Sequence, residues 1–189
     1  MDRASYNAWR LGLLILLLTL LTGAGLALAL AGGLADPPRA ANIAYQTDSL
    51  DGLAQVGALG AVALYMLPQL PAAPFTLEVE ASNGSSAGAS WGVWVRADGA
   101  DRALLVDNRG YMLTTLFASE PEWRAFMHIQ APRSRLYVHV ENGRAAFRIN
   151  QELVTTIPVE QVEGVGLALY GHPRLTWHSI TLRTDVNAS

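Results

Sequence analysis

The chain has 189 residues, 51% of them hydrophobic, and a formal net charge of −3 at pH 7. This length suffices for one ordinary domain and a short extra segment, but not for two sizeable cores. The chain has no cysteine, which excludes disulfides, thiolate nucleophiles, thiolate metal sites and cysteine acylation. Its 13 basic residues are all arginines, so lysine-based nucleophiles and Schiff bases are excluded too. The codon bias of a GC-rich bacterial genome would account for the missing lysine.

The first predicted element is a hydrophobic segment over residues 11–35 that contains no charged residue. A helix of this length would span about 37 Å, against about 30 Å for the hydrocarbon core of a bilayer. Arg3 and Arg10 precede the segment, and the positive-inside rule therefore places residues 1–10 in the cytoplasm. The sequence predicts a single-pass signal anchor in the cell membrane, followed by a linker over residues 36–42 and an extracytoplasmic domain.

A cleaved signal peptide is the alternative interpretation of the same segment. Leu11–Leu21 would then be its hydrophobic region, and cleavage would follow Ala29 or Ala35, each the last residue of a small-residue motif. The uninterrupted length favours retention, whereas Thr22 and the glycines after it favour cleavage. Both interpretations export the remainder of the chain.

The exported part, residues 43–185, has the pattern of an all-β domain, with residues 186–189 as a tail. Short runs rich in Val, Leu, Phe, Trp and Tyr recur between turn residues, and hydrophobic side chains alternate with polar ones within them. Asn142-Gly143 is the strongest hairpin signal. The expected strands are Gly60–Leu67, Phe75–Ala81, Trp91–Arg96, Leu104–Asn108, Tyr111–Thr115, Phe126–Ala131, Arg135–Glu141, Ala145–Asn150, Leu153–Ile157, Gly164–Tyr170 and Leu175–Arg183.

So many short strands in one domain predict two packed antiparallel sheets, that is, a jelly-roll sandwich, or a barrel. Residues 40–74 are the least constrained part. The run LAQVGALGAVALYML in this region fits either two strands or one strand with an irregular crossing.

A family resemblance covers roughly residues 75–183. Its features, in chain order, are FTLEVEA, GVWVR, LLVDNRGYM, EWRAFMHI, RLYVHVENGRAAFRIN, EGVGLALYG and LTWHSITL. This succession resembles the concanavalin A-like lectin/glucanase superfamily, and within it the laminin G-like and 3-keto-disaccharide hydrolase-type domains. The resemblance implies the jelly-roll fold. It does not choose among the carbohydrate binders, glycosidases and scaffolding domains of that superfamily.

The residue types needed for catalysis are incomplete. Glycosidases of this superfamily place three acidic residues on one strand face, whereas this chain has only Glu78 and Glu80. The stretch Gly84–Gly88 matches G-x-S-x-G by letter, but a strand is predicted after it where a nucleophile elbow needs a helix. No catalytic residue is therefore assigned, and a binding role is favoured over an enzymatic one.

Metal and nucleic-acid binding have little support. None of the four histidines shares the helical spacing of a zinc site, and no metal ligand is assigned. Calcium is the one cofactor considered, through loop oxygens of Asp98, Asp101, Asp107 and Asn108, although their spacing matches no calcium loop. After Ala35 the chain has 11 arginines and 15 acidic residues, a mildly acidic balance that gives no reason to bind nucleic acid.

The positive signal is aromatic. Trp94, Trp123, Tyr111, Tyr137 and Tyr170 occupy positions that alternation or turn placement puts outside the core, although Trp123 also fits a core position at a strand entry. A sugar can stack on such rings while arginine or histidine binds its hydroxyl groups. The candidate ligand-binding residues are Trp94, Arg96, Tyr111, Tyr137 and His139.

The sequence thus predicts a membrane-anchored, extracytoplasmic β-sandwich that acts as a binding or assembly module. Its partner would be a glycan or other subunits of a membrane complex. The alternative is a carbohydrate-active hydrolase resembling the 3-keto-disaccharide hydrolases, which requires acidic residues close together in an aromatic-lined cleft.

Overall fold

The computed structural model describes residues 3–31, 36–70, 72–85, 88–117, 120–129 and 132–185. The chain divides into two compact units, Met1–Pro37 and Pro38–Ser189. Their boundary falls inside the predicted linker, and the predicted tail lies outside the described residues.

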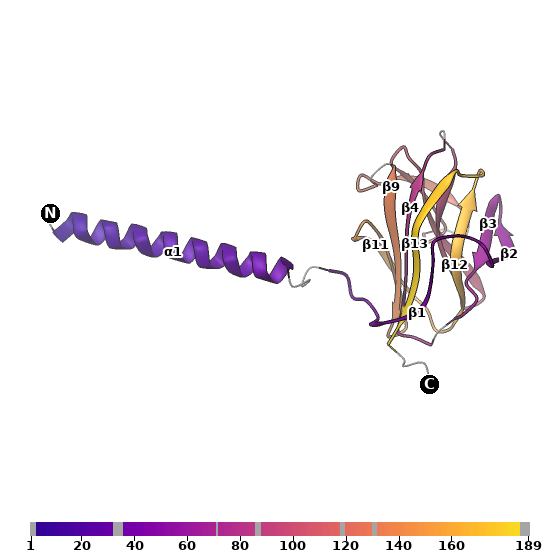
Figure 1. Ribbon diagram of the computed structural model, residues 1–189, viewed down its shortest axis with the longest axis horizontal. Coiled ribbons are helices and arrows are strands. Elements are labelled where there is room, and N and C mark those ends of the chain that lie inside the picture. Colours follow the sequence, from indigo (N-terminus) through magenta and orange to yellow (C-terminus); the bar gives the residue numbers. More distant parts are fainter. Residues whose placement is uncertain are drawn as a thin grey trace. The chain divides into compact units, whose positions relative to one another are not determined.

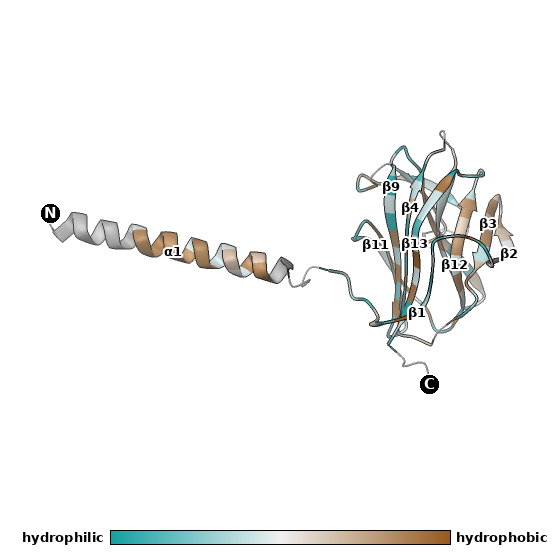
Figure 2. Cartoon of the chain, viewed as in Figure 1, coloured by the Kyte–Doolittle hydropathy of each residue, from teal (hydrophilic) through white to brown (hydrophobic). Residues whose placement is uncertain are grey.

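The first unit contains one helix, α1 (Arg3–Ala31). It begins earlier than the predicted segment because residues 3–10 contain neither proline nor glycine to interrupt it. Its described side chains, residues 12–28, are mostly apolar (Figure 2). They are also well exposed, from 49% at Leu13 to 74% at Leu28. Within the described part of the chain, no helix combines the length and apolarity needed to cross a membrane.

The second unit is a sandwich of two antiparallel sheets, as predicted (Figure 1). Sheet A has six strands in the order β1-β13-β4-β9-β10-β11, and sheet B has seven in the order β2-β3-β12-β5-β6-β7-β8. The strands are β1 (Asn42–Thr47), β2 (Ala54–Leu59), β3 (Val62–Met66), β4 (Phe75–Asn83), β5 (Ser90–Ala97), β6 (Ala100–Val106), β7 (Tyr111–Thr114), β8 (Glu122–Ala125), β9 (Arg133–Glu141), β10 (Arg144–Ile149), β11 (Glu152–Pro158), β12 (Val162–Tyr170) and β13 (Leu175–Thr184).

Alternating side chains from the two sheets form the main core between them. Phe75, Leu77 and Val79 of β4 enter it from sheet A, and Val93 and Val95 of β5 enter it from sheet B. These five side chains are at most 1% exposed. Because every second residue of a strand faces the same side, the intervening residues of β4 and β5 lie on the outer faces of the sandwich.

Most predicted strands are confirmed, and three regions differ. β1 is not among the expected strands. In the least constrained region, the run after Leu53 forms the paired strands β2 and β3, which is the two-strand alternative. The strand expected at Phe126–Ala131 is wrong over its described residues, and β8 precedes it instead. Phe126 and Ile129 lie in a turn, in which the Ile129 amide donates to the Phe126 carbonyl. Their apolar side chains pack against the core from this turn, which explains the strand-like pattern.

The two ends of the sandwich differ in their connections. The chain enters the sandwich at the end where Asn42 of β1 pairs with Thr184 of β13. Antiparallel pairing places the end of β4, the end of β6 and the end of β12 at the opposite end. The loops that follow these three strands therefore gather at the end farther from the point of entry.

Candidate functional site

The five residues predicted to bind a ligand do not converge. Trp94 and Arg96 of β5 and Tyr111 of β7 belong to sheet B. Tyr137 and His139 of β9 belong to sheet A and lie on its outer face. The two sets occupy opposite sides of the sandwich. These five residues therefore do not form one binding surface.

Trp94 is a core residue, which corrects its predicted exposure. It is 0% exposed, and its indole Nε1 donates a 3.0 Å hydrogen bond to the carbonyl of Tyr65. Its ring lies over Gly164 and Gly166 of β12, where a Cβ atom would come within 3.2 Å and 3.0 Å of the indole. The residues buried together on this face of sheet B, here called the outer cluster, are Val62, Leu64, Trp94, Ala103, Leu105, Leu113 and Ala168.

Arg96 is also engaged within the domain. Its Nε and Nη2 donate to the two carboxylate oxygens of Asp101 at 2.9 Å and 3.2 Å, and its guanidinium carbon lies 5.5 Å from the centre of the Trp94 ring. The hydrogen bonds to Asp101 raise the pKa of Arg96. Arg96 thus packs over Trp94 of the outer cluster, and Asp101 already accepts hydrogen bonds from its Nε and Nη2.

Tyr137 and His139 are buried on the outer face of sheet A, at 3% and 7% exposure. The Nδ1 atom of His139 lies 2.9 Å from the hydroxyl of Thr76, and that hydroxyl also accepts a 3.0 Å hydrogen bond from the amide of Ala40. Burial raises the pKa of Tyr137 to about 12. The hydroxyl of Thr76, which His139 also contacts, thus attaches the entering chain to sheet A.

Tyr111 is the predicted residue that remains open, with 44% of its surface exposed. The guanidinium of Arg109 lies 5.5 Å from the Tyr111 ring centre and 5.8 Å from that of Trp123, which is 41% exposed. Trp123 in turn makes an edge contact with Tyr170, the ring centroids being 5.9 Å apart. These four residues, Arg109, Tyr111, Trp123 and Tyr170, are called the aromatic platform below.

Asp107 positions the arginine of the platform. Its side chain is only 1% exposed, and its Oδ1 accepts hydrogen bonds from the amides of Arg109 and Tyr111 at 2.8 Å and 2.9 Å. Its Oδ2 accepts from the Arg109 Nε at 2.7 Å. The buried carboxylate thereby shapes the β6–β7 turn and orients the guanidinium, whose Nη groups hold further donors.

The platform adjoins an open cavity of about 870 Å³ at the loop end of the sandwich. Asn108 donates to the carbonyls of Asn83 and Ser85 at 3.1 Å and 2.6 Å, which ties the β6–β7 turn to the β4–β5 loop. Ser85 and Tyr170 both line the cavity. The platform and the cavity therefore form one continuous surface.

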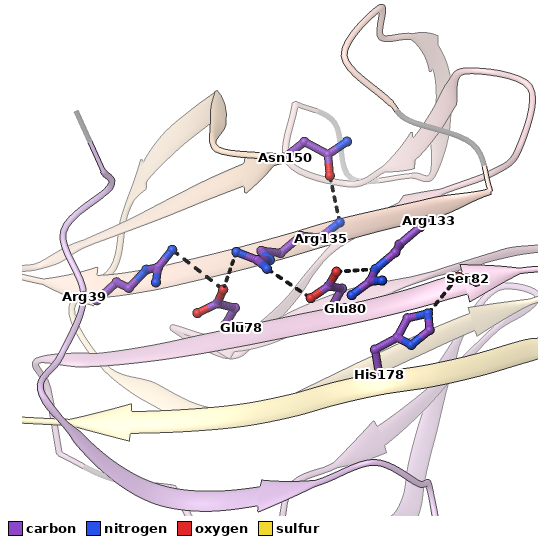
Figure 3. A network of polar contacts seen from close by, with 8 residues as sticks. All are labelled: Arg39, Glu78, Glu80, Ser82, Arg133, Arg135, Asn150 and His178. Atoms are coloured by element: carbon purple, nitrogen blue, oxygen red, sulfur yellow. Dashed lines mark hydrogen bonds and ion pairs between the residues drawn. The ribbon is translucent and has the colours of Figure 1, made fainter. Parts of the chain in front are cut away.

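The two carboxylates of β4 in sheet A take part in a network of ion pairs with arginines (Figure 3). Glu78 and Glu80 lie on its outer face, and Arg135 bridges them with ion pairs of 3.3 Å and 3.0 Å. Arg39 also pairs with Glu78, at 3.8 Å, and Arg133 with Glu80. Burial alone would raise the pKa of Glu80, but the hydrogen bonds and charges of Arg133 and Arg135 outweigh it and lower that pKa. A proton donor for glycoside cleavage needs the opposite shift.

The oxygens considered for calcium are dispersed. Asp98 accepts from the amides of Glu160 and Gln161, and Asp101 from Arg96. Asp107 lies beyond the other end of β6 from Asp101. Among the described residues, no group of three or more histidine and acidic side chains is arranged to hold a metal ion.

Part of this surface is predicted by the sequence. Tyr111 is among the predicted ligand-binding residues, and Trp123 and Tyr170 are predicted to lie outside the core, whereas Arg109 is not among the candidates. The available signal was the turn Asp107-Asn108-Arg109-Gly110 before an aromatic residue, in which an aspartate two residues before an arginine can accept from its backbone and its side chain.

Comparisons with known proteins give similarity of fold only. No family model and no curated protein matches the chain. Among solved structures, the carbohydrate-binding module CBM66 from Bacillus subtilis is 14% identical with a TM-score of 0.49, covering 78% of this chain and 100% of that one. A Bacillus subtilis protein of unknown function with a galectin-like fold is 11% identical, with a TM-score of 0.48 and coverages of 77% and 97%. Caenorhabditis elegans galectin LEC-6 is 12% identical, with a TM-score of 0.42 and coverages of 63% and 94%. At these values the likeness assigns no ligand, activity or site residue to this chain.

Proposed function

We propose that this chain is a glycan-binding module that its N-terminal helix holds at the outer face of a membrane. The observation that carries the binding role is the aromatic platform, where two well-exposed rings flank an arginine beside an open cavity. Exposed aromatic side chains held in a fixed arrangement indicate a binding surface rather than a packing requirement.

The chemistry of the platform fits a sugar. The C–H face of a sugar ring is apolar and stacks on an indole or phenol plane, while its hydroxyl groups need hydrogen-bond donors and acceptors. Trp123 and Tyr111 offer the planes, and Arg109 offers Nη donors between them. Asp107 already holds the backbone amide and the Nε of Arg109. Ligand binding therefore has to immobilise few additional rotatable bonds of the Arg109 side chain.

Binding is favoured over hydrolysis by the state of the acidic residues. Glu78 and Glu80 are ion-paired with arginines on sheet A, whereas the platform belongs to sheet B. The carboxylate beside the platform, Asp107, is buried and already accepts three hydrogen bonds. The hydrolase alternative would need two free carboxylates facing one ligand.

The anchoring part of the proposal rests on residues 11–35 and on the exposed leucines of α1. A helix whose described leucines are about half exposed or more needs lipid or a partner protein to cover them. With Arg3 and Arg10 on the cytoplasmic side, the sandwich would lie outside the cell membrane. The platform is at the end of the sandwich opposite to the point where the chain enters it.

A glycan array probed with the full-length protein in detergent tests the binding role. The wild type should bind at least one class of glycan, and Trp123→Ala should weaken that binding by about 30-fold, since a well-packed tryptophan at an interface contributes about 2 kcal/mol. Trp177→Phe is the control, because Trp177 contacts Trp91 in the main core. Binding to no glycan, with stoichiometric protein subunits co-purifying instead, would favour the assembly role.

Membrane fractionation with mass spectrometry of the intact chain tests the anchor. The proposal expects the protein in the membrane fraction with its N-terminus intact. A soluble chain that begins near Asp36 would show that residues 11–35 act as a cleaved signal peptide instead.

A further inference from the structure

The cavity at the loop end of the sandwich has a chemical character of its own. The loops after β4 and β12 and the β2–β3 hairpin surround it, and its polar lining residues are Ser85, Tyr170, His172 and Arg174. Tyr170 also belongs to the aromatic platform, so a chain of sugar units that stacks on Trp123 would extend toward this cavity.

The two loops are locked together by their backbones. The amide of Gly84 donates a 2.8 Å hydrogen bond to the carbonyl of Arg174, and the amide of Arg174 donates to the hydroxyl of Ser85. Gly171 has a φ of 69°, and a Cβ atom there would lie 2.9 Å from the carbonyl oxygen of Gly88. The backbone that carries Arg174 is therefore held in place at the rim of the cavity.

The charged side chain that lines the cavity is basic. Arg174 and His172 are its basic residues, and the described residues that line it include no aspartate or glutamate. Arg174 is exposed, and within the described part of the chain its guanidinium forms no ion pair of 4.0 Å or less with a carboxylate. Most other arginines on this domain are paired, for example Arg96 with Asp101 and Arg109 with Asp107. An unpaired guanidinium on a backbone that is held beside a cavity is suited to a planar anion.

We propose that the cavity binds the carboxylate of an acidic sugar unit, so that the ligand of this module is a uronic-acid glycan. The guanidinium of Arg174 pairs with the carboxylate, and Tyr170 and Trp123 contact the adjoining sugar ring. This inference rests on the proposed glycan-binding function and narrows its ligand class.

The test compares acids with their own methyl esters. Oligomers of galacturonate, glucuronate and mannuronate, and the methyl ester of each, are titrated by calorimetry into the full-length protein in detergent. Esterification removes the charge while keeping the sugar ring, so the wild type should bind at least one acid more tightly than its ester. Arg174→Ala should weaken binding of that acid about 10- to 100-fold, since a hydrogen-bonded ionic contact contributes about 1.5–3 kcal/mol, and leave ester binding unchanged.

The matched control is Arg144→Ala. Arg144 is an exposed arginine at the start of β10 on sheet A, so its removal changes the net charge equally without touching the cavity. Equal binding of acid and ester, or equal losses in the two arginine variants, would overturn the inference. Failure to bind any acid while neutral glycans bind on the array would overturn the inference alone, whereas failure with every glycan would overturn the proposed function too.

Discussion

The edge of the Trp123 ring meets the Tyr170 ring at a centroid distance of 5.9 Å and an interplanar angle of 77°. The two residues come from β8 and β12, which three other strands of sheet B separate. Across a flat sheet, four strand spacings amount to about 19 Å. Sheet B is therefore curved, and Tyr170 also packs against the outer cluster. The same two rings form part of the surface that we propose binds a glycan.

Replacing Trp94 and Trp123 of sheet B by alanine, one at a time, should distinguish a residue needed for stability from a residue needed for binding. Trp94→Ala removes a fully buried ring and should lower the free energy of unfolding by about 3–5 kcal/mol. Trp123→Ala removes a ring that is 41% exposed and should lower the free energy of unfolding by about 1–2 kcal/mol, while weakening glycan binding about 30-fold. Urea unfolding followed by tyrosine fluorescence and circular dichroism measures both. Equal destabilisation by the two changes would contradict the assignment of Trp94 to the core and Trp123 to the site.

Gly166 should be intolerant of any side chain. A Cβ atom at this position would lie 1.9 Å from the Tyr65 carbonyl oxygen and 3.0 Å from the Trp94 indole nitrogen. We expect Gly166→Ala to lower the free energy of unfolding by at least about 2 kcal/mol, because backbone atoms on β3 must move. Gly57→Ala on β2 is the control, since a Cβ atom there meets nothing within 4 Å. Similar unfolding curves for the two variants would show that β12 and β3 are less closely apposed.

The arginine pairs of Glu80 should make the domain acid-sensitive. Because the pKa of Glu80 is lowered in the folded state from its usual 4.5, its contribution to stability is complete above the unfolded value and is lost as the pH falls through the folded value. Urea unfolding of the wild type between pH 7 and pH 3 should therefore show a loss of stability that is smaller in Glu80→Gln. Glu122→Gln, which alters an exposed pair with Arg124 on β8, is the control. An unchanged acid dependence in Glu80→Gln would refute this origin.

Thr76 should control how firmly the entering chain is attached. Its hydroxyl accepts from the Ala40 amide and contacts the His139 ring, and both Thr76 and Ala40 are at most 1% exposed. Thr76→Val removes the acceptor while keeping the shape, so the Ala40 amide should exchange its hydrogen about tenfold faster or more, as expected for loss of about 1–2 kcal/mol. Thr76→Ser keeps the hydroxyl and should preserve slow exchange. Fast exchange at Ala40 in the wild type would contradict the attachment.

Tyr137 should ionise only at high pH. Burial raises the pKa of Tyr137 to about 12 in the folded state, compared with about 10 in the unfolded state. The stability that comes from the neutral phenol is therefore fully present below the unfolded-state pKa and is lost as the pH rises through the folded-state pKa. Ultraviolet titration of Tyr137→Phe should lack this late step, whereas Tyr111→Phe should retain it. A late step that survives in Tyr137→Phe would assign it to another tyrosine.

The fold was largely predictable because alternation marks which residues of a strand face the core. Val93 and Val95 opposite Trp94 and Arg96 follow that rule, and the Asn142-Gly143 turn has the positive φ angles of 50° and 70° that its sequence implies. The strand expected at Phe126 failed because an apolar residue in a turn can reach the core without belonging to a strand.

The site was only partly predictable, because alternation gives the face of a strand but not the sheet to which it belongs. Trp94 and Tyr137 both face away from the main core, yet they lie on opposite sheets. Nor does one strand reveal the curvature that buries Trp94 under its neighbours. Arg109 was missed because its role depends on Asp107, Tyr111 and Trp123 meeting in space.

The role of the aromatic platform as the glycan site is tested by NMR of the full-length protein in detergent. The indole Nε1–H signals are assigned with single Trp→Phe variants. The oligosaccharide that binds most strongly on the array is the titrant. We predict that the Trp123 signal shifts in proportion to occupancy, while the buried Trp94 signal, whose Nε1 donates to Tyr65, moves little. Binding that leaves the Trp123 signal in place would contradict the aromatic platform as the glycan site.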